Sequence, residues 1–504
     1  MYRIFLISFF LFSTFVYSQN PIFYAEDITA KELKSMLTIY ASDAFQGREA
    51  GTKGEQMAVE YLRDEYQKIG VSAAKLDGDY FQYIPLRLNK PPKVNISINS
   101  EKFSYYQDFI NVSSGPTKNM RFDSYIYVGH GIKDAKYNDY ENIDVSGKLV
   151  VAISGEPKNK EGNYFVSGSD KTSKWSDDRQ SLSAKQNLAK EMGAAAFILI
   201  DESLFKRYAR YYKRKDQSEE ETNLSLNVNS NPFYGFLVGD SIGNSLIRKK
   251  NGIYYSNIQI DYNSAFESLV SKNVVALIPG SEIPNEYIVI SAHLDHIGVH
   301  HGDVFNGADD DGSGTVAILE IAEAFQKAVK NGDGPKRSIL LLHVSAEEKG
   351  LLGSQYYTDF DPIVPLKNTV ANLNIDMIGR IDPKRKKGKR NYIYLIGSNR
   401  LSTELHEISE MVNEKYTGIE LDYTFNDEND PNRFYYRSDH YNFANKNIPI
   451  IFYFNGTHED YHKATDTVDK IQFDLLENRA KLVFYTAWEL ANRKERIIVD
   501  KKFK

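Results

Sequence analysis

The residues best able to do chemistry stand at the ends of apolar segments in the second half of the chain. Carboxylates and imidazoles follow five such segments in turn: His293 with Asp295, the triplet Asp309, Asp310 and Asp311, the pair Glu347 and Glu348, then Asp376, and finally His462. Taken singly, each is typical of ordinary structure, such as a hydrogen-bonded His–Asp pair or an acidic helix cap. Brought together without a cation, they would repel one another and be poorly solvated. The set therefore predicts a metal site.

The available ligand types restrict the metal. The chain has no cysteine, so histidine, aspartate and glutamate are the strong ligands that remain. Two zinc ions about 3.5 to 4 Å apart can share a bridging carboxylate and a bridging hydroxide. We assign five residues to such a pair of zinc ions: His293, Asp310, Glu348, Asp376 and His462. Their three carboxylates oppose four positive charges, and a hydroxide neutralises the remaining charge.

Glu347 and Asp295 stay outside this ligand set and are predicted to assist catalysis. Glu347 adjoins a metal ligand, so its carboxylate is placed to act as a general base on the water. We expect Glu347 and Glu348 to face different partners. Asp295 is expected to accept a hydrogen bond from the other ring nitrogen of His293 and so fix its tautomer.

Other histidines near these motifs are less favoured as ligands. Four of them are competing imidazoles: His296, His300, His301 and His458. His462 is preferred to His458 because it directly precedes the turn sequence KATDT. His343 lies within an apolar strand and is predicted to be a core histidine. Asp439 and His440 are compatible with either a pocket wall or a structural pair.

The elements that must position these residues alternate between strands and helices. Near-continuous apolar strands that alternate with helices indicate an α/β fold with a mixed, mostly parallel sheet sandwiched by helices. In such a sheet, ligands bind beyond the carboxyl ends of the strands. Residues 89–266 show a different pattern of strands and helices, which predicts a smaller inserted α/β domain. The main domain is then discontinuous, formed by residues 19–88 and 267–497.

The composition and the amino-terminal residues indicate which partners the protein can bind and where it is located. A net charge of -6 over 504 residues offers no broad basic face for nucleic acid. The opening residues MYRIFLISFFLFSTFVYSQN predict a signal peptide, residues 1–18, cleaved after Ser18. We therefore expect an exported protein, periplasmic or secreted, with no integral membrane segment after signal removal. The sequence leaves the oligomeric state open.

The ordered motifs AHLDHIG, NGADDDGSG, SAEEKGLLGS, NIDMIG and DYHKATDT resemble those of the co-catalytic di-zinc exopeptidase family. That family includes bacterial leucyl aminopeptidases, glutamate carboxypeptidase and, more distantly, glutaminyl cyclases and transferrin receptors. The resemblance implies that His293 and Asp376 hold one zinc, that Glu348 and His462 hold the other, and that Asp310 bridges them. It also implies a cis peptide bond after Asp310. Residues 89–266 resemble a protease-associated domain.

These observations favour an exported zinc aminopeptidase that cleaves the first residue from peptides, with Glu347 as general base. A carboxypeptidase or dipeptidase of the same family would share every metal ligand, and Arg433 or Arg437 would then bind the terminal carboxylate. A glutaminyl cyclase uses a single zinc, and neither Trp175 nor Trp488 adjoins the motifs. A noncatalytic, receptor-like member is a further alternative, which the intact ligand set disfavours.

Overall fold

The computed structural model describes residues 20–502 except 114, 179, 218–223 and 229–231. The predicted signal peptide, residues 1–18, lies outside the described residues. The chain divides into two compact units, one formed by the residues up to Leu86 together with those from Leu269 onward, and the other by Arg87–Ser268. The chain passes between them in two long strands, β2 (Phe81–Ile98) and β10 (Gly252–Ile278). Among the described residues, no helix combines the length and apolarity needed to cross a membrane.

The first unit contains a mixed sheet in the order β17-β16-β18-β15-β11-β14-β10. Besides β10, its strands are β11 (Ile283–His293), β14 (Arg337–Val344), β15 (Thr369–Ile375), β16 (Tyr392–Ile396), β17 (Glu420–Asp422) and β18 (Ile450–Phe454). The central strands β14, β11, β15 and β18 run parallel. Strand β10 is antiparallel to β14, and β16 is antiparallel to β18. The predicted mixed, mostly parallel sheet is confirmed.

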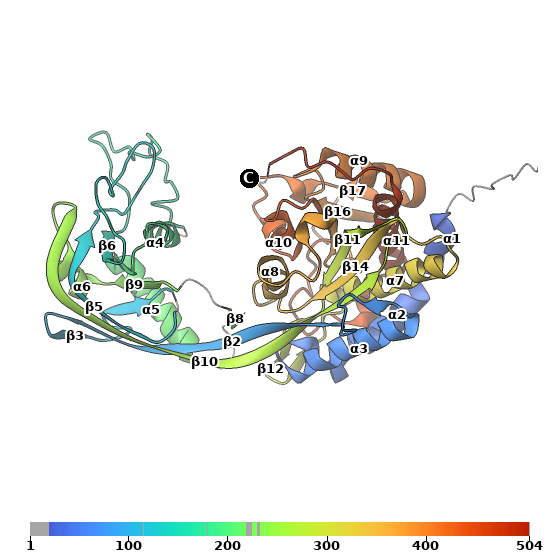
Figure 1. Cartoon of the computed structure of the whole chain (residues 1–504), viewed down its shortest axis with the longest axis horizontal. Helices are drawn as coiled ribbons and strands as arrows, with labels where there is room; N and C mark the ends of the chain where they lie inside the picture. Colours follow the sequence, from blue (N-terminus) through green and yellow to red (C-terminus); the bar gives the residue numbers. More distant parts are fainter. Residues whose placement is uncertain (1–19, 114, 179, 218–223, 229–231, 503–504) are drawn as a thin grey trace, which may run out of the picture. The chain divides into compact units, whose positions relative to one another are not determined.

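Helices cover both faces of this sheet, as predicted. One face carries α2 (Ala30–Tyr40), α3 (Lys53–Ile69), α7 (Gly314–Lys330), α9 (Thr403–Val412) and α11 (Phe473–Asn492), and the other carries α8 (Leu352–Asp359) and α10 (His440–Ala444). Figure 1 shows α7 and α11 on one side of β11 and β14, and α8 on the other. Successive side chains of β14 alternate between the two cores: Leu341 belongs to the same core as Phe325, whereas Leu342 belongs to the core that contains Tyr357 and Phe443.

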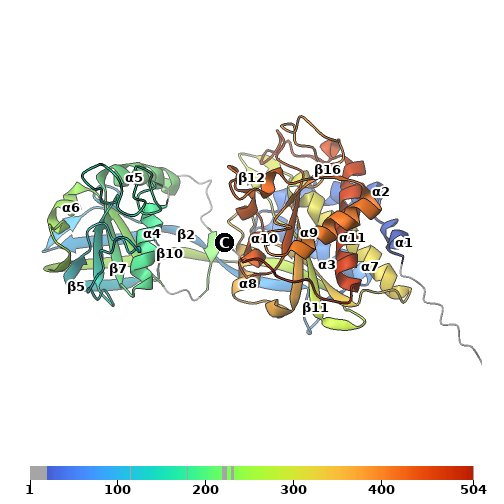
Figure 2. The same cartoon turned by 90° about the horizontal axis from the view of Figure 1, so that it is seen from above.

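The second unit is a smaller α/β structure. Its sheet has the order β10-β5-β6-β7-β9-β4, in which β5 (Lys118–Tyr127), β6 (Leu149–Ile153), β7 (Ala196–Ile200) and β9 (Tyr234–Val238) are parallel and β4 (Phe109–Asn111) is antiparallel. The helices are α4 (Ser181–Glu191), α5 (Glu202–Gln217) and α6 (Asp240–Leu246), and Figure 2 shows α4 beside β7. The likeness to a protease-associated domain and the boundaries 89 and 266 stay predictions.

The parallel strands of the first unit bring distant residues to one edge. His293 is the last residue of β11, Glu347 and Glu348 follow β14, and Asp376 follows β15. Since β11 lies between β14 and β15 and runs parallel to both, their carboxyl ends meet at the same edge. The fold therefore places these side chains together, although more than fifty residues separate His293 from Glu347 in the sequence.

His343 is a core histidine, as predicted. It lies in β14 and is fully buried, and its Nε2 is 2.7 Å from the hydroxyl oxygen of Tyr66 in α3. Burial lowers the pKa of His343 from 6.5 to about 3. The folded protein therefore keeps this imidazole neutral at mildly acidic pH, where an unfolded chain would protonate it.

This burial predicts a pH dependence of stability. Between about pH 6.5 and pH 3 the unfolded state binds a proton at His343 that the folded state does not. The free energy of unfolding should fall by up to about 1.4 kcal/mol per pH unit from this residue as the pH drops. Urea unfolding with a chelator present, at several pH values, should show a shallower dependence for His343→Gln than for the natural chain. Identical slopes for the two proteins would contradict the prediction.

Candidate metal centre

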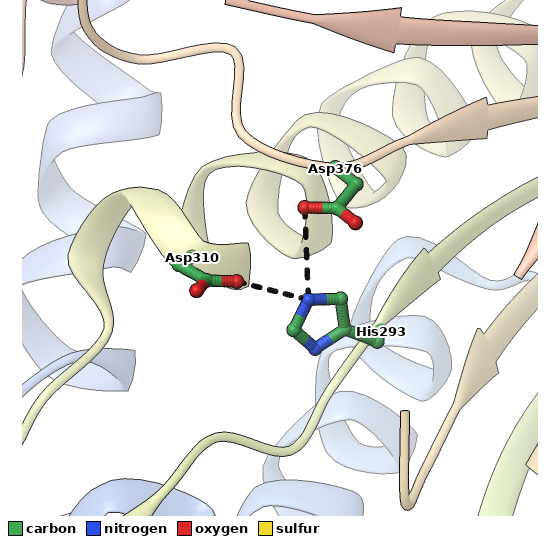
Figure 3. Close-up of side chains that lie close together, drawn as sticks. All are labelled: His293, Asp310 and Asp376. Atoms are coloured by element: carbon green, nitrogen blue, oxygen red, sulfur yellow. Dashed lines mark hydrogen bonds and ion pairs between the residues drawn. The ribbon is translucent and has the colours of Figure 1, made fainter. Parts of the chain in front are cut away.

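Two buried carboxylates from separate segments approach one ring nitrogen of His293, which is also buried. His293 Nε2 lies 3.1 Å from Oδ1 of Asp310 and 3.8 Å from Oδ1 of Asp376. Figure 3 shows both carboxylates directed at this nitrogen. The three donor atoms all lie within 4.8 Å of one another, which is close enough for one metal ion to bind them together.

A second group shares Asp310 with the first. The other oxygen of Asp310, Oδ2, lies 3.2 Å from Nε2 of His462, which is also 3.3 Å from Oε2 of Glu348. His296 faces the same carboxylates, because its Nδ1 lies 2.9 Å from Oε1 of Glu348. The structure thus brings the five predicted metal ligands together, with Asp310 between the two groups.

The donor atoms fit the binding of cations. Among the described residues, several buried side-chain atoms of this cluster have no hydrogen-bond partner: Oδ2 of Asp310, Oε1 of Glu348, and both ring nitrogens of His296. Buried polar atoms without partners are costly, and coordination by a metal ion would satisfy them. Imidazole nitrogens and carboxylate oxygens, with no thiolate, form a ligand set that suits zinc.

The two adjacent glutamates have different surroundings, as expected. Burial raises the pKa of Glu347 well above its usual value, and the negative charges of Glu348 and Asp376 add to this, although His293 opposes it. Burial and Asp310 act to raise the pKa of Glu348, but His296 and His462 lower it to about 2. Glu348 therefore faces the imidazoles as an anion, whereas the Glu347 carboxylate lines the open pocket.

Asp295 is placed differently from our expectation. Nδ1 of His293 lies 3.0 Å from the backbone carbonyl oxygen of Asp295, whereas the Asp295 carboxylate is 3.8 Å away. The carboxylate instead accepts a hydrogen bond of 3.1 Å from the backbone N–H of Glu347. The chain turns directly after β11, so that the carbonyl of residue 295 reaches the ring first. Asp295 thus orients His293 through its main chain and Glu347 through its side chain.

The outer members of the Asp triplet brace the loop that carries Asp310. Asp311 accepts hydrogen bonds from the backbone N–H groups of His293 and Met377, at 3.2 and 3.0 Å. It thereby ties the ends of β11 and β15 to this loop. The peptide bond between Asp310 and Asp311 is cis, as the family resemblance implies.

His458 belongs to this bracing layer. Its Nε2 lies 3.2 Å from Oδ2 of Asp309, whereas His462 contacts Asp310. The side chain of Asp466, in the KATDT turn, accepts hydrogen bonds from the backbone N–H groups of Asp309 and Asp310. Of the two competing histidines, His462 is the one that lies against Asp310 and Glu348, and it is also the one that the sequence favoured.

Sequence reasoning missed Arg48, whose side chain is fully buried beside the centre. Its guanidinium donates hydrogen bonds to the carbonyl oxygens of Leu294, Asn306 and Gly307. Arg48 therefore clamps the segment that follows His293 to the segment that precedes Asp309. Nη1 also donates to the nearby carbonyl of Tyr40, but no local pattern marks the clamp, because Leu294, Asn306 and Gly307 are more than two hundred residues away.

A pocket opens beside the carboxylates. It is lined by the carboxylates and imidazole of Asp310, Glu347, Asp376 and His462, and its other walls are Met377, Phe434, Arg437, Phe452, Phe454, Thr457 and Tyr461. The walls are mainly apolar and aromatic, with one guanidinium. Asp439 and His440 are structural: Asp439 accepts a hydrogen bond from Ser354, and His440 stacks on Phe452.

Residues 273–487 match the model of peptidase family M28. The match begins in β10 and ends in α11, so this matched segment, called the M28 domain below, contains every residue of the predicted metal site.

Two relatives illustrate the similarity of the M28 domain to named proteins. Leucine aminopeptidase 1 of Coccidioides posadasii is 31% identical over 228 residues, which cover 44% of this chain and 55% of that protein. A probable glutamate carboxypeptidase of Arabidopsis thaliana, LAMP1, is 35% identical over 112 residues, 22% of this chain and 15% of that protein. The match thus spans about half the length of the leucine aminopeptidase.

Solved structures are also similar. The aminopeptidase from Aneurinibacillus sp. strain AM-1 aligns with a TM-score of 0.48 at 18% identity, covering 96% of this chain and 98% of that one. BSAP, a zinc aminopeptidase from Bacillus subtilis, aligns with a TM-score of 0.46 at 20% identity, covering 94% and 99%.

The packing around Gly307 predicts a sharp difference between two glycines. A Cβ at Gly307 would lie 2.2 Å from the carbonyl oxygen of Asp310 and 2.5 Å from Cγ of His296, whereas Gly302 has no atom within 4 Å. Both have positive φ, so alanine is strained at either position, but only at 307 does it also collide. We expect Gly307→Ala to be less stable than Gly302→Ala by roughly 2 to 3 kcal/mol in urea unfolding. Equal stabilities of the two variants would contradict the prediction, because they would show that the loop around Gly307 can move to accommodate a methyl group.

Proposed function

We propose that the M28 domain is a two-zinc aminopeptidase that removes the first residue from peptides. The observation that carries the proposal is the position of Asp310, whose two oxygens face different donor groups. Oδ1 lies 3.1 Å from Nε2 of His293, and Oδ2 lies 3.2 Å from Nε2 of His462. In this proposal Asp310 would be a ligand of two ions, the first held also by His293 and Asp376 and the second also by Glu348 and His462.

The bound ions would polarise the carbonyl of the scissile bond and lower the pKa of the attacking water. The proton transfers fall to Glu347, whose carboxylate lines the same pocket as Asp310 and Asp376. As general base it takes a proton from the water, and as general acid it gives that proton to the leaving amine. Asp295 is a positioning residue, because it holds the backbone N–H of Glu347.

The charge of the pocket favours an amino terminus over a carboxyl terminus. Glu347 lines the pocket and is not a proposed metal ligand, so its carboxylate would attract the ammonium group of a substrate. The aromatic walls, which include Phe434 and Phe454, suit an apolar first side chain. The similarity of the M28 domain to leucine aminopeptidase 1 supports the same end preference.

A carboxypeptidase or dipeptidase is the second candidate, because Arg437 also lines the pocket. Its Nη2 lies 3.4 Å from the hydroxyl oxygen of Tyr461, which stacks on His462. A guanidinium there would bind a terminal carboxylate. The similarity to a probable glutamate carboxypeptidase supports this alternative over a shorter segment. A glutaminyl cyclase, with its single zinc, makes no use of the second donor group.

Export remains part of the proposal and depends on residues 1–18, whose arginine and apolar run are typical of a signal peptide. The mature enzyme would then act on peptides outside the cytoplasm. The absence of cysteine leaves zinc binding and the apolar cores to stabilise it there.

Blocked peptides test which end of the substrate is recognised. The zinc-loaded protein should hydrolyse dipeptides and tripeptides whose carboxyl terminus is amidated, because the free ammonium group is what the Glu347 carboxylate attracts. Peptides with an acetylated amino terminus should be resistant. Release of free amino acids, measured by chromatography, decides the question. Cleavage of the acetylated peptides alone would replace the aminopeptidase proposal with the carboxypeptidase.

Replacing Glu347 separates proton transfer from metal binding. Glu347→Gln should bind zinc as the natural protein does, since Glu347 is not a proposed ligand. Its turnover should fall by roughly 10²- to 10⁴-fold, because the amide cannot accept the proton. Zinc content by atomic emission and the hydrolysis rate of an amino-acid amide give the two readouts. The matched variant Glu348→Gln should lose zinc as well as activity. Retained turnover in Glu347→Gln would exclude the proposed base.

A further inference from the structure

We propose that His296 is a fourth protein ligand of the metal ion held by Asp310, Glu348 and His462. This inference rests on the proposed two-zinc site and assigns the two metal positions different roles. The ion near Glu348 would have four protein donors, whereas the ion near His293 would have three and so keep a coordination position for water or substrate.

The position of the His296 ring carries the inference. Nδ1 of His296 lies 2.9 Å from Oε1 of Glu348 and 3.9 Å from Oδ2 of Asp310, and the three donor atoms lie within 4.8 Å of one another. His462 contacts the opposite oxygen of Glu348, Oε2, at 3.3 Å. The two rings are inclined at 71° with centroids 6.0 Å apart, so they approach the carboxylates from different directions.

The burial of His296 requires a partner for its ring. The residue is fully buried, and among the described residues neither ring nitrogen makes a well-directed hydrogen bond, although Nδ1 lies 2.9 Å from Oε1 of Glu348. Other buried histidines differ in this respect. His343 hydrogen-bonds with Tyr66, His440 with the carbonyl of Tyr435, and His458 accepts a hydrogen bond from the N–H of Asp460. A buried imidazole left without partners is costly, and a metal ion facing Nδ1 would remove that cost.

The ring is also held in place. It packs against Gly307 so closely that a Cβ there would lie 2.5 and 2.6 Å from its Cγ and Cδ2. The carbonyl oxygen of Gly307 accepts a hydrogen bond of 3.0 Å from Nη2 of Arg48, which fixes the backbone under the ring. His296 therefore faces Glu348 in a preset orientation, as a metal ligand requires.

The two positions differ in donor number as a result. Asp310, Glu348, His296 and His462 supply four donors, the number that zinc has in closed structural sites. His293, Asp310 and Asp376 supply three, the number typical of catalytic zinc sites with an open position. An added imidazole is neutral, so it tightens binding without changing the charge balance of the pair.

Zinc affinity and a cobalt spectrum test the inference in the full-length protein. His296→Ala and His296→Asn would be compared with the natural chain and with His300→Ala, a histidine on the same segment whose ring contacts the carbonyl of Ile297. Competition with a chromophoric chelator should show one tightly bound and one weaker zinc in the natural protein. In both His296 variants the affinity for the tight zinc should fall by roughly 10- to 100-fold. The absorption bands of the cobalt-substituted protein should change too, and His300→Ala should match the natural protein.

The outcomes separate this inference from the proposed function. If the natural protein binds no zinc tightly, the two-zinc proposal itself fails. If it binds two, and both His296 variants keep its zinc affinity and cobalt spectrum, the inference alone is overturned. Thermal unfolding with and without zinc tests whether His296 has a merely structural role. If His296 is a ligand, its replacement should reduce the stabilisation that added zinc gives, and the metal-free variants should unfold at nearly the same temperature as the metal-free natural protein. If His296→Ala does not fold, the same measurements on His296→Asn decide the question.

Discussion

The mutual repulsion of buried carboxylates around Asp310 is the constraint on which the rest of this centre depends. Glu347, Glu348 and Asp376 lie beside Asp310 at a site where Asp310 and Asp376 are buried and the two glutamates are only partly exposed. Negative charges crowded in this way are tolerated only when imidazoles and cations compensate them. His293 and His462 contact the two oxygens of Asp310, and the proposed zinc ions would supply the remaining positive charge.

The surrounding structure holds this unfavourable group in place through backbone contacts. Arg48 clamps the segments on either side of the β12–β13 turn (Gly298–His300 and Asp303–Phe305), and Asp311 joins the ends of β11 and β15. Three residues of the centre adopt left-handed backbone conformations although they are not glycine: Ala346, Met377 and His462. Such conformations cost energy and persist where the fold enforces them, often at functional sites.

The proposed difference between the two metal positions gives this arrangement a chemical purpose. A closed position with two imidazoles would anchor one ion and the bridging carboxylate. The position near His293 and Asp376 would keep a place for the reacting water, and Asp376 lines the same pocket as Glu347 and His462. In this proposal the neighbouring glutamates divide in the same way, since Glu348 would face the anchored ion and Glu347 would handle protons.

Much of the peptidase unit was predictable because its signals are local in the sequence. Apolar strands alternating with helices predicted the mixed sheet, and polar residues directly after those strands predicted the cluster that includes His293, Glu348 and Asp376. The same reasoning separated His343, inside a strand, from the metal site. These predictions succeed because parallel strands must bring their carboxyl ends to one edge.

Other features were decided only by tertiary structure. The partner of His293 is the carbonyl of Asp295 rather than its carboxylate, and sequence cannot distinguish two acceptors of one residue. Arg48 acts on backbone atoms far along the chain, which leave no pattern in the sequence. His296 was only one of several nearby imidazoles until the packing of Gly307 showed which way its ring faces. Residue types and spacing thus determined which groups gather at this edge, whereas the direction each one faces depends on packing between segments distant in sequence.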